Sequence, residues 1–320
     1  MGTLVGHVAP GFGFFAIGLW HLLNHIRVHA GNPKPATYTS LPWFPTPRIR
    51  YLELFFIISG CLASIAMELF IGPERHQPFD TDGTIPSDHL HNFEHSNISM
   101  AFLAYAVLCI VLDRTSAPAR DAMSYFLGAV AFGQQLLLFH LHSADHMGVE
   151  GQYHWLLQIV VFVSLATTLL SIPFPNSFIN AFVRSYSILL QGVWFMVMGF
   201  MLWTPGLVPK GCFISSEDGH QVVRCHSHQA LERAKSLVNI QFSWYVIGVT
   251  GFAVSFYVVL VGLLYGHHEG EYQSLFDDGQ EEVIAVMEED IESQKGRKNG
   301  GPKSFLEADQ KMFASSEMER

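Results

Sequence analysis

Seven apolar segments, each about 20 residues long, constrain this chain more than any other feature of its sequence. A helix that crosses a bilayer needs roughly 20 consecutive apolar residues, and hydrocarbon offers its backbone no other hydrogen-bond partner. The composition agrees, because 49% of the residues are hydrophobic and only 14% are charged. We therefore expect an all-α, seven-transmembrane-helix integral membrane bundle. The predicted spans are residues 8–27, 51–71, 93–112, 122–142, 154–173, 181–203 and 237–264.

The acidic charge of the chain is concentrated after the last span. Residues 266–320 hold 14 acidic and 6 basic residues, and the whole chain has a net charge of −10. We predict a membrane domain over residues 1–265 and an acidic cytosolic tail over residues 266–320, which is mostly disordered because it has little apolar surface to bury. A short apolar stripe (Val283, Ile284, Met287 and Ile291) leaves open a helix that docks onto a cytosolic protein partner. We see no basic face suited to nucleic acid.

Basic residues in the connecting loops predict the orientation of the bundle. The loop between the first two spans holds Arg27, Lys34, Arg48 and Arg50 and no acidic residue, which indicates the cytoplasmic side. The N-terminus is then lumenal or extracellular, and the C-terminal tail is cytosolic. The loop between the sixth and seventh spans argues the other way. It contains Lys210, Arg224, Arg233 and Lys235.

Two of the four cysteines lie in a polar loop. Cys212 and Cys225 are both in the loop between the sixth and seventh spans, whereas Cys61 and Cys109 lie in apolar segments. Because the predicted orientation puts that loop in an oxidising compartment, we expect a disulfide between Cys212 and Cys225. Two free thiols in a cytosolic loop are the alternative.

Residues 136–157 join the fourth and fifth spans and hold four histidines and two acidic residues. Polar groups so close to hydrocarbon are costly unless they are paired or functional. His142 and His146 are four residues apart, so they share a helical face if the helix continues. With the predicted topology, polar residues from the first five spans meet at the same lumenal end. They are His7, Glu68, His91, Glu94, His95, His142, Asp145, His146 and His154.

The segment His91-Asn92-Phe93-Glu94-His95 fits the inverted zincin pattern H-x-x-E-H. In that pattern two imidazoles bind zinc and the glutamate acts as general base on the bound water. We therefore predict a zinc site with His91, His95, His142 and His146 as ligands and Glu94 as the catalytic base. Residues that would hydrogen-bond these ligands, or replace one of them, are His7, Glu68, His140, Asp145 and His154. The alternative is a group of hydrogen-bonded histidines without a metal.

A separate polar cluster is predicted at the cytosolic end. His21 and His25 are four residues apart, and Glu53 lies at the same depth on the second span. A buried histidine–glutamate network explains them better than a metal site. Because this pair lies at the opposite end from the other histidines, the sequence also disfavours a membrane di-iron oxygenase, whose histidine motifs share one side.

Four long motifs resemble the transmembrane protein 45 family, and most closely its plant branch of viral-response-like proteins. They are GHVAPGFGFFAIGLWHL, HLHNFEHSNIS, LLLFHLHSADHMGVEGQYHWLLQ and RSYSILLQGVWFMVMGF. The resemblance covers about residues 1–275. It implies a multi-pass protein of the endomembrane system or plasma membrane. Because the family has no established activity, the resemblance supplies no catalytic residues.

Two classes of function remain open. The first is a zinc-dependent hydrolase that acts on a lipid or other amphiphile and needs Glu94. The second is non-enzymatic. It is either an adaptor in trafficking or defence response that works through the acidic tail, or a transporter of a metal or small solute. A transporter needs polar residues through the whole span, including His21, His25, Glu53 and Gln191. In each case membrane lipids surround the protein.

Overall fold

The computed structural model describes residues 3–31, 38–72, 77–143, 148–217 and 220–297. Within these ranges, the side chains of residues 88, 142, 143, 220 and 265–297 lie outside the description. The chain divides into two units, Met1–Leu264 and Tyr265–Arg320. The first unit contains all the candidate spans.

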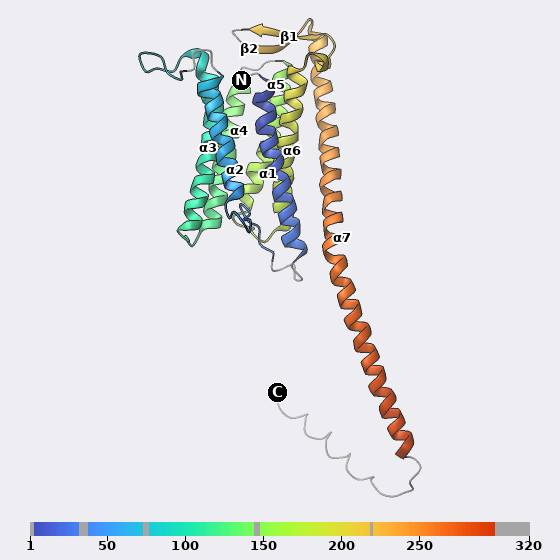
Figure 1. The fold of residues 1–320 in the computed structure, drawn as a ribbon. Helices are drawn as coiled ribbons and strands as arrows, with labels where there is room; N and C mark the ends of the chain where they lie inside the picture. Colours follow the sequence, from blue (N-terminus) through green and yellow to red (C-terminus); the bar gives the residue numbers. More distant parts are fainter. Residues whose placement is uncertain (1–2, 32–37, 73–76, 144–147, 218–219, 298–320) are drawn as a thin grey trace, which may run out of the picture. The chain divides into compact units, whose positions relative to one another are not determined.

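Seven helices long and apolar enough to cross a membrane make up the first unit, as the sequence predicts. Consecutive helices run in opposite directions, so the N-terminus of α1 and the connection between α6 and α7 lie at the same end (Figure 1). The helices are α1 (Leu4–Ala30), α2 (Leu52–Ala66), α3 (Leu90–Arg114), α4 (Arg120–Ser143), α5 (Val149–Leu170), α6 (Phe178–Trp203) and α7 (His228–Arg297).

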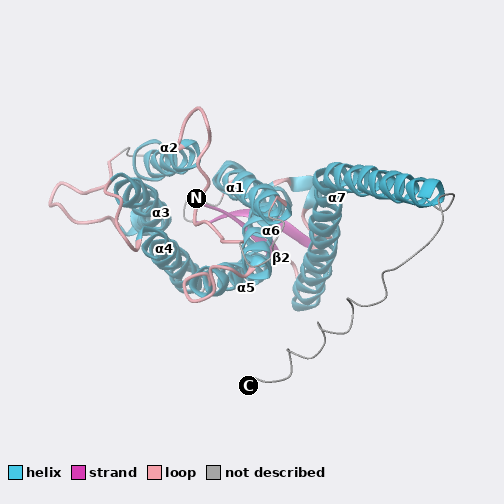
Figure 2. Cartoon of the chain, turned by 90° about the horizontal axis from the view of Figure 1, so that it is seen from below, coloured by secondary structure: helices cyan, strands magenta, loops and turns pink. Residues whose placement is uncertain are grey.

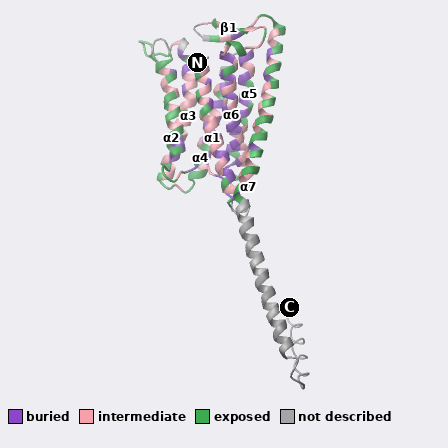
Figure 3. Cartoon of the chain, turned by 45° about the vertical axis from the view of Figure 1, so that its right-hand side comes forward, coloured by how far each residue is buried: buried purple, intermediate pink, exposed green. Residues whose placement is uncertain are grey.

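Helices α1 to α6 form a ring, with α7 outside it (Figure 2). Each helix packs against its neighbour in sequence, and α1 packs against α6 to close the circle. Buried residues are concentrated along α5 and α6 (Figure 3). Helix α7 lies against the outer side of α6, where Phe242 packs edge-on against Trp194 with ring centroids 4.9 Å apart.

Glycines bring the backbones of α1 and α6 close together. A Cβ atom on Gly18 of α1 would lie 2.3 Å from the backbone nitrogen of Leu189, and one on Gly192 of α6 would lie 2.2 Å from that of Phe15. Small residues at such positions let helices in a membrane approach closely and gain van der Waals contact. The α1–α6 contact is therefore the tight seam of the ring.

Local sequence explains where several helices begin and bend. Thr3 caps α1, because its side-chain oxygen accepts a hydrogen bond from the Gly6 nitrogen at 3.1 Å. The helix therefore starts earlier than the predicted span, which begins at residue 8, and Pro10 lies inside α1. Helix α2 ends in a π-helical turn over Met67–Ile71, which contains the buried Glu68. Turns of this kind are frequent at functional sites.

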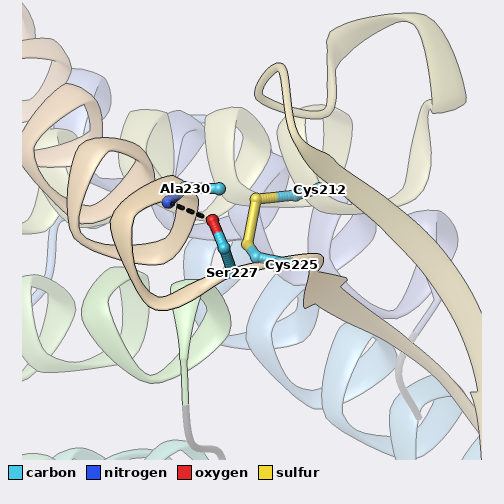
Figure 4. Close-up of a disulfide and its surroundings, with 4 residues drawn as sticks. All are labelled: Cys212, Cys225, Ser227 and Ala230. Carbon is cyan, nitrogen blue, oxygen red and sulfur yellow. Dashed lines mark hydrogen bonds between the residues drawn. A yellow bond between two sulfur atoms is a disulfide. The ribbon is translucent and has the colours of Figure 1, made fainter.

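A β-hairpin joins α6 to α7, which the all-α prediction did not include. Strand β1 (Cys212–Glu217) pairs antiparallel with β2 (His220–Cys225), and the predicted disulfide between Cys212 and Cys225 is confirmed (Figure 4). The side chain of Ser227 then accepts a hydrogen bond from the Ala230 nitrogen and caps α7. Val223 of β2 is buried in the main apolar core.

The backbone of α7 extends further than the predicted span. It remains helical to Arg297, past the end of the first unit at Leu264. Residues 281–292 include five glutamates, and glutamate is a strong helix former. Short one-turn 3₁₀ segments precede α3 (Ser87–His89) and follow α6 (Pro205–Leu207).

Candidate functional site

A cavity of about 490 Å³ lies inside the ring and is lined by residues of all six of its helices. This volume falls within the range of roughly 300–1,000 Å³ found for small-molecule sites. Much of the wall is apolar and aromatic, while polar side chains gather toward its two ends. The aromatic wall includes Phe14, Phe102, Phe132, Phe139 and Phe195.

The cavity also has a lateral side between α1 and α2. Phe12 of α1, Phe56 and Gly60 of α2, and Met67 of the π-helical turn line the cavity and are exposed. A Cβ atom added to Gly13 or Gly60 would meet no other atom within 4 Å. These exposed lining residues leave the cavity accessible on the side between the two helices.

Four polar residues line the cavity near the β-hairpin, and we call them the hairpin-end cluster: His7, Glu68, His95 and His154. Glu68 lies 3.6 Å from the Nδ1 atom of His95. Its other oxygen accepts a hydrogen bond from Asn92 at 3.1 Å. Glu68 is buried, so these partners reduce the cost of placing its carboxyl group in the bundle.

Backbone carbonyls fix the two other rings of this cluster. Nδ1 of His7 donates to the carbonyl of Thr3 at 3.1 Å, and Nδ1 of His154 donates to that of Glu150 at 3.0 Å. A carbonyl only accepts, so both Nδ1 atoms carry the proton. The two ring centroids lie 5.9 Å apart. The cluster therefore brings imidazoles from α1, α3 and α5 to one end of the cavity.

The H-x-x-E-H segment divides between two environments. Nδ1 of His91 lies 3.4 Å from Glu94, and both side chains are about one-third exposed. His95, one turn further along α3, contacts Glu68 and lines the cavity, whereas His91 and Glu94 are not among the described residues that do so. The side chain predicted as a catalytic base thus pairs with the predicted ligand His91.

The predicted zinc ligands from α4 are only partly described. Nδ1 of His140 lies 3.3 Å from Oε1 of Gln158 on α5. The side chain of His142, together with Asp145 and His146, lies outside the described residues. Among the side chains that are described, no three of His, Cys, Asp and Glu come together as a metal-ligand set. The zinc site therefore stays a prediction.

A second polar group lies at the opposite end, and we call it the loop-end cluster: His21, His25, Glu53 and Arg184. Glu53 accepts three hydrogen bonds, from Nε2 of His21 at 2.7 Å, from Nε1 of Trp20 at 3.0 Å and from the backbone nitrogen of Phe44 at 2.9 Å. The predicted network of His21, His25 and Glu53 is thus present, and it includes more groups than the sequence suggested.

Arg184 of α6 connects this network. Its Nη2 atom donates to the carbonyl of Leu41 at 2.8 Å and to Nε2 of His25 at 3.1 Å. An arginine has no acceptor, so Nε2 of His25 is unprotonated and Nδ1 donates to Tyr38, 2.9 Å away. The guanidinium carbon also lies 4.7 Å from the ring centroid of Tyr125. No role was predicted for Arg184 from the sequence, although a lone arginine within an apolar span is a signal of one.

The segment 38–44 closes this end of the ring. Besides Leu41 and Phe44, it is held by the Ser40 nitrogen, which donates to the Pro175 carbonyl at 2.8 Å, and by the Pro42 carbonyl, which accepts from Tyr105 at 3.2 Å. Tyr38, Trp43 and Phe44 are all buried. Burial raises the pKa of Tyr38. This loop is therefore a built part of the cavity floor.

Comparison with known proteins supports the membrane class. A family model described as "Family of unknown function (DUF716)" matches residues 121–258, which run from α4 into α7. The chain is 24% identical over 212 residues to mouse Transmembrane epididymal protein 1A and 26% identical over 212 residues to rat Transmembrane epididymal protein 1. Each match covers 64% of this chain and 68% of the relative. Together with the seven apolar helices, these similarities support an integral, multi-pass membrane protein.

Proposed function

We propose that this protein is a non-enzymatic intramembrane carrier that binds a lipid-like amphiphile inside the ring of α1 to α6. The lateral side of the cavity between α1 and α2 is the observation that supports this most strongly. An amphiphile dissolved in the bilayer enters such a cavity without first crossing water. This proposal is a more specific form of the small-solute transporter, one of the alternatives that the sequence left open.

The lining of the cavity suits a molecule with a long apolar body. The chain would lie among aromatic side chains such as Phe14, Phe102 and Phe195, and the polar group would lie at the hairpin-end cluster. Polar clusters at both ends of one cavity also favour a carrier, because a polar group that crosses the bilayer needs partners on each side. The tightly bonded segment 38–44 would then be the barrier at the far end.

The test is photolabelling of the purified full chain in lipid nanodiscs with diazirine-bearing palmitic acid. Gly13→Trp and Gly60→Trp each place a large side chain into open space at the cavity wall. Gly251→Trp on α7 is the matched control, since its Cβ atom also meets nothing within 4 Å and it is not among the residues that line the cavity.

We expect labelled peptides from the cavity walls, with labelling reduced severalfold by either cavity substitution and unchanged by Gly251→Trp. Equal labelling of all four proteins would overturn the proposal. Melting temperatures measured by tryptophan fluorescence identify a variant that fails to fold. The second cavity variant then decides the outcome.

Zinc-dependent hydrolysis of an amphiphile is the second candidate. The contact between Glu68 and His95 at the cavity wall favours it, because a carboxylate beside a histidine is a common arrangement around metal ligands. Further ligands would come from His142 or His146. Elemental mass spectrometry of the purified protein tests it: about one zinc per chain, lost in His95→Ala, supports the enzyme, and no bound metal removes it.

The finer assignments made from sequence belong to the same proposal. They are membership of the plant branch of the transmembrane protein 45 family, residence in the endomembrane system or plasma membrane, a lumenal N-terminus and a cytosolic tail.

An adaptor that works through residues 266–320 is distinguished from a carrier by truncation of the tail. A carrier retains amphiphile binding without the tail, and an adaptor loses its protein partner.

A further inference from the structure

One buried side chain in the wall of the cavity has an unusual environment. Gln135 of α4 lines the cavity and has no exposed surface. Neither Oε1 nor Nε2 has a hydrogen-bond partner among the described residues. A buried polar group without a partner costs about 1–3 kcal/mol, and an amide contains two such groups. Because Gln135 also lines the cavity, a molecule bound there can supply the hydrogen-bond partners that the described residues do not.

The position of Gln135 indicates what that partner is. It lies eight residues before the end of α4 at Ser143, which is about 12 Å along the helix axis. Its neighbours one turn away on the same helix are Phe132 and Phe139, which also line the cavity. The amide is therefore within an apolar stretch, below the hairpin-end cluster, where a charged group would be costly.

We infer that the Gln135 amide recognises a neutral polar group on the bound amphiphile, one that both donates and accepts hydrogen bonds. A hydroxyl or a carboxamide on a long apolar chain has this chemistry. The inference rests on the proposed function, because it specifies the ligand of the same cavity. It assigns Gln135 as the residue that distinguishes an amphiphile with such a group from a plain hydrocarbon.

The test is competition against the diazirine-bearing palmitic acid probe by hexadecane, 1-hexadecanol and hexadecanamide. These share one chain length and differ in hydrogen-bonding capacity. The protein is compared with Gln135→Met, which keeps the length of the side chain and removes its amide. Gln191→Met is the matched control. Gln191 on α6 is also fully buried, and among the described residues its amide atoms have no hydrogen-bond partner and it does not line the cavity.

We expect 1-hexadecanol and hexadecanamide to displace the probe at concentrations about five- to tenfold lower than hexadecane, the size of one net hydrogen bond. Gln135→Met should abolish this preference, and Gln191→Met should keep it. Because Gln135→Met removes an unpaired polar group, its melting temperature should not fall. Gln135→Leu is measured as a second variant.

Two results would overturn the inference. One is equal displacement by all three compounds in the unaltered protein, which would mean that water inside the cavity satisfies the amide. The other is a preference that survives both Gln135 substitutions. In either case the proposed carrier function would still hold if two results are seen. Hexadecane must displace the probe, and Gly13→Trp and Gly60→Trp must reduce the labelling. Failure of that function shows instead as labelling that no cavity substitution changes.

Discussion

Nη2 of Arg184 donates a hydrogen bond to the backbone carbonyl of Leu41 at 2.8 Å, across 143 residues of sequence. The same guanidinium nitrogen donates to Nε2 of His25, and the neighbouring His21 donates a hydrogen bond to Glu53. A single buried arginine thus connects the loop after α1 to α6, which is distant from that loop in the sequence. The end of the cavity away from the β-hairpin is closed by side chain-to-backbone bonds and not by apolar contact alone.

Removing this arginine should destabilise the bundle and open its floor. Arg184→Met eliminates a buried charge and leaves the Leu41 carbonyl and Nε2 of His25 without their donor, so we expect a loss of about 3 kcal/mol in unfolding free energy. Thermal unfolding of the purified protein in detergent measures it. Arg48→Met in the same loop is the control, because Arg48 is exposed, and it should leave the melting temperature unchanged. Equal behaviour of the two variants would contradict the assigned role.

The α1–α6 seam predicts opposite effects for two glycines on one helix. Gly18→Ala places its Cβ atom 2.3 Å from the Leu189 nitrogen, whereas the Cβ atom of Gly13→Ala meets nothing within 4 Å. Overpacking costs about 1–3 kcal/mol, and replacing a helical glycine gains about 0.5–1 kcal/mol. Gly18→Ala should therefore lower the melting temperature in detergent, and Gly13→Ala should raise it slightly. A stable Gly18→Ala protein would mean that α1 and α6 do not approach so closely.

The disulfide gives a direct test of orientation. Cys212 and Cys225 are bonded, and the β-hairpin lies at the same end of the bundle as the start of α1. On intact cells that express the full chain, an impermeant maleimide should label these cysteines only after treatment with an impermeant reductant. Cys212→Ser with Cys225→Ser is the control for labelling elsewhere. Labelling that requires permeabilised cells would put the hairpin on the cytosolic side or in an internal compartment, and sealed microsomes separate these two cases.

Acid should weaken the hairpin through one ion pair. Arg224 donates from Nε to Glu217 at 2.8 Å, and this hydrogen bond lowers the pKa of Glu217. A carboxylate with a lowered folded-state pKa stabilises above its unfolded pKa, and this contribution disappears as the pH falls through the folded value. Below about pH 4, near the unfolded pKa of a glutamate, the pair should therefore begin to fail.

Hydrogen exchange of peptides from β1 and β2 measures this effect. The protection of the unaltered protein relative to Glu217→Gln should be largest near pH 7 and should shrink as the pH falls through the lowered pKa of Glu217. Because both side chains are exposed, the difference should be small and should shrink at high salt. A difference that does not change with pH would show that the ion pair does not stabilise the hairpin.

Hydrophobic length alone was enough to predict the seven spans, because an apolar helix in lipid has few alternatives. The partners of polar residues were harder to predict. His91, Glu94 and His95 share a helical face by spacing, yet one helical turn separates His95, level with Glu68, from His91 beside Glu94. Periodicity predicts the direction in which a side chain leaves its own helix. It does not predict which groups of the neighbouring helices lie at the same level.

Ring closure was hidden from the sequence for a related reason. Gly18 and Gly192 are ordinary glycines in apolar segments until α6 is known to lie against α1. Arg184 and His25 are 159 residues apart, so no local pattern connects them. The hairpin had a local signal that the sequence analysis did not use: Asp218-Gly219 stands between two runs that contain β-branched residues.

The seam between α1 and α6 joins the first and sixth helices, so it can form only late in synthesis. Gly18 leaves the ribosome long before Leu189, and at about 5–20 residues per second the delay is on the order of 10–30 s. During that interval His21 and His25 of α1 lack Arg184, which they contact in the complete protein. Until α6 is made, the partners available to these histidines are Glu53 of α2 and Tyr38 of the loop after α1. The end of the cavity that holds them is therefore completed only when the sixth helix enters the membrane.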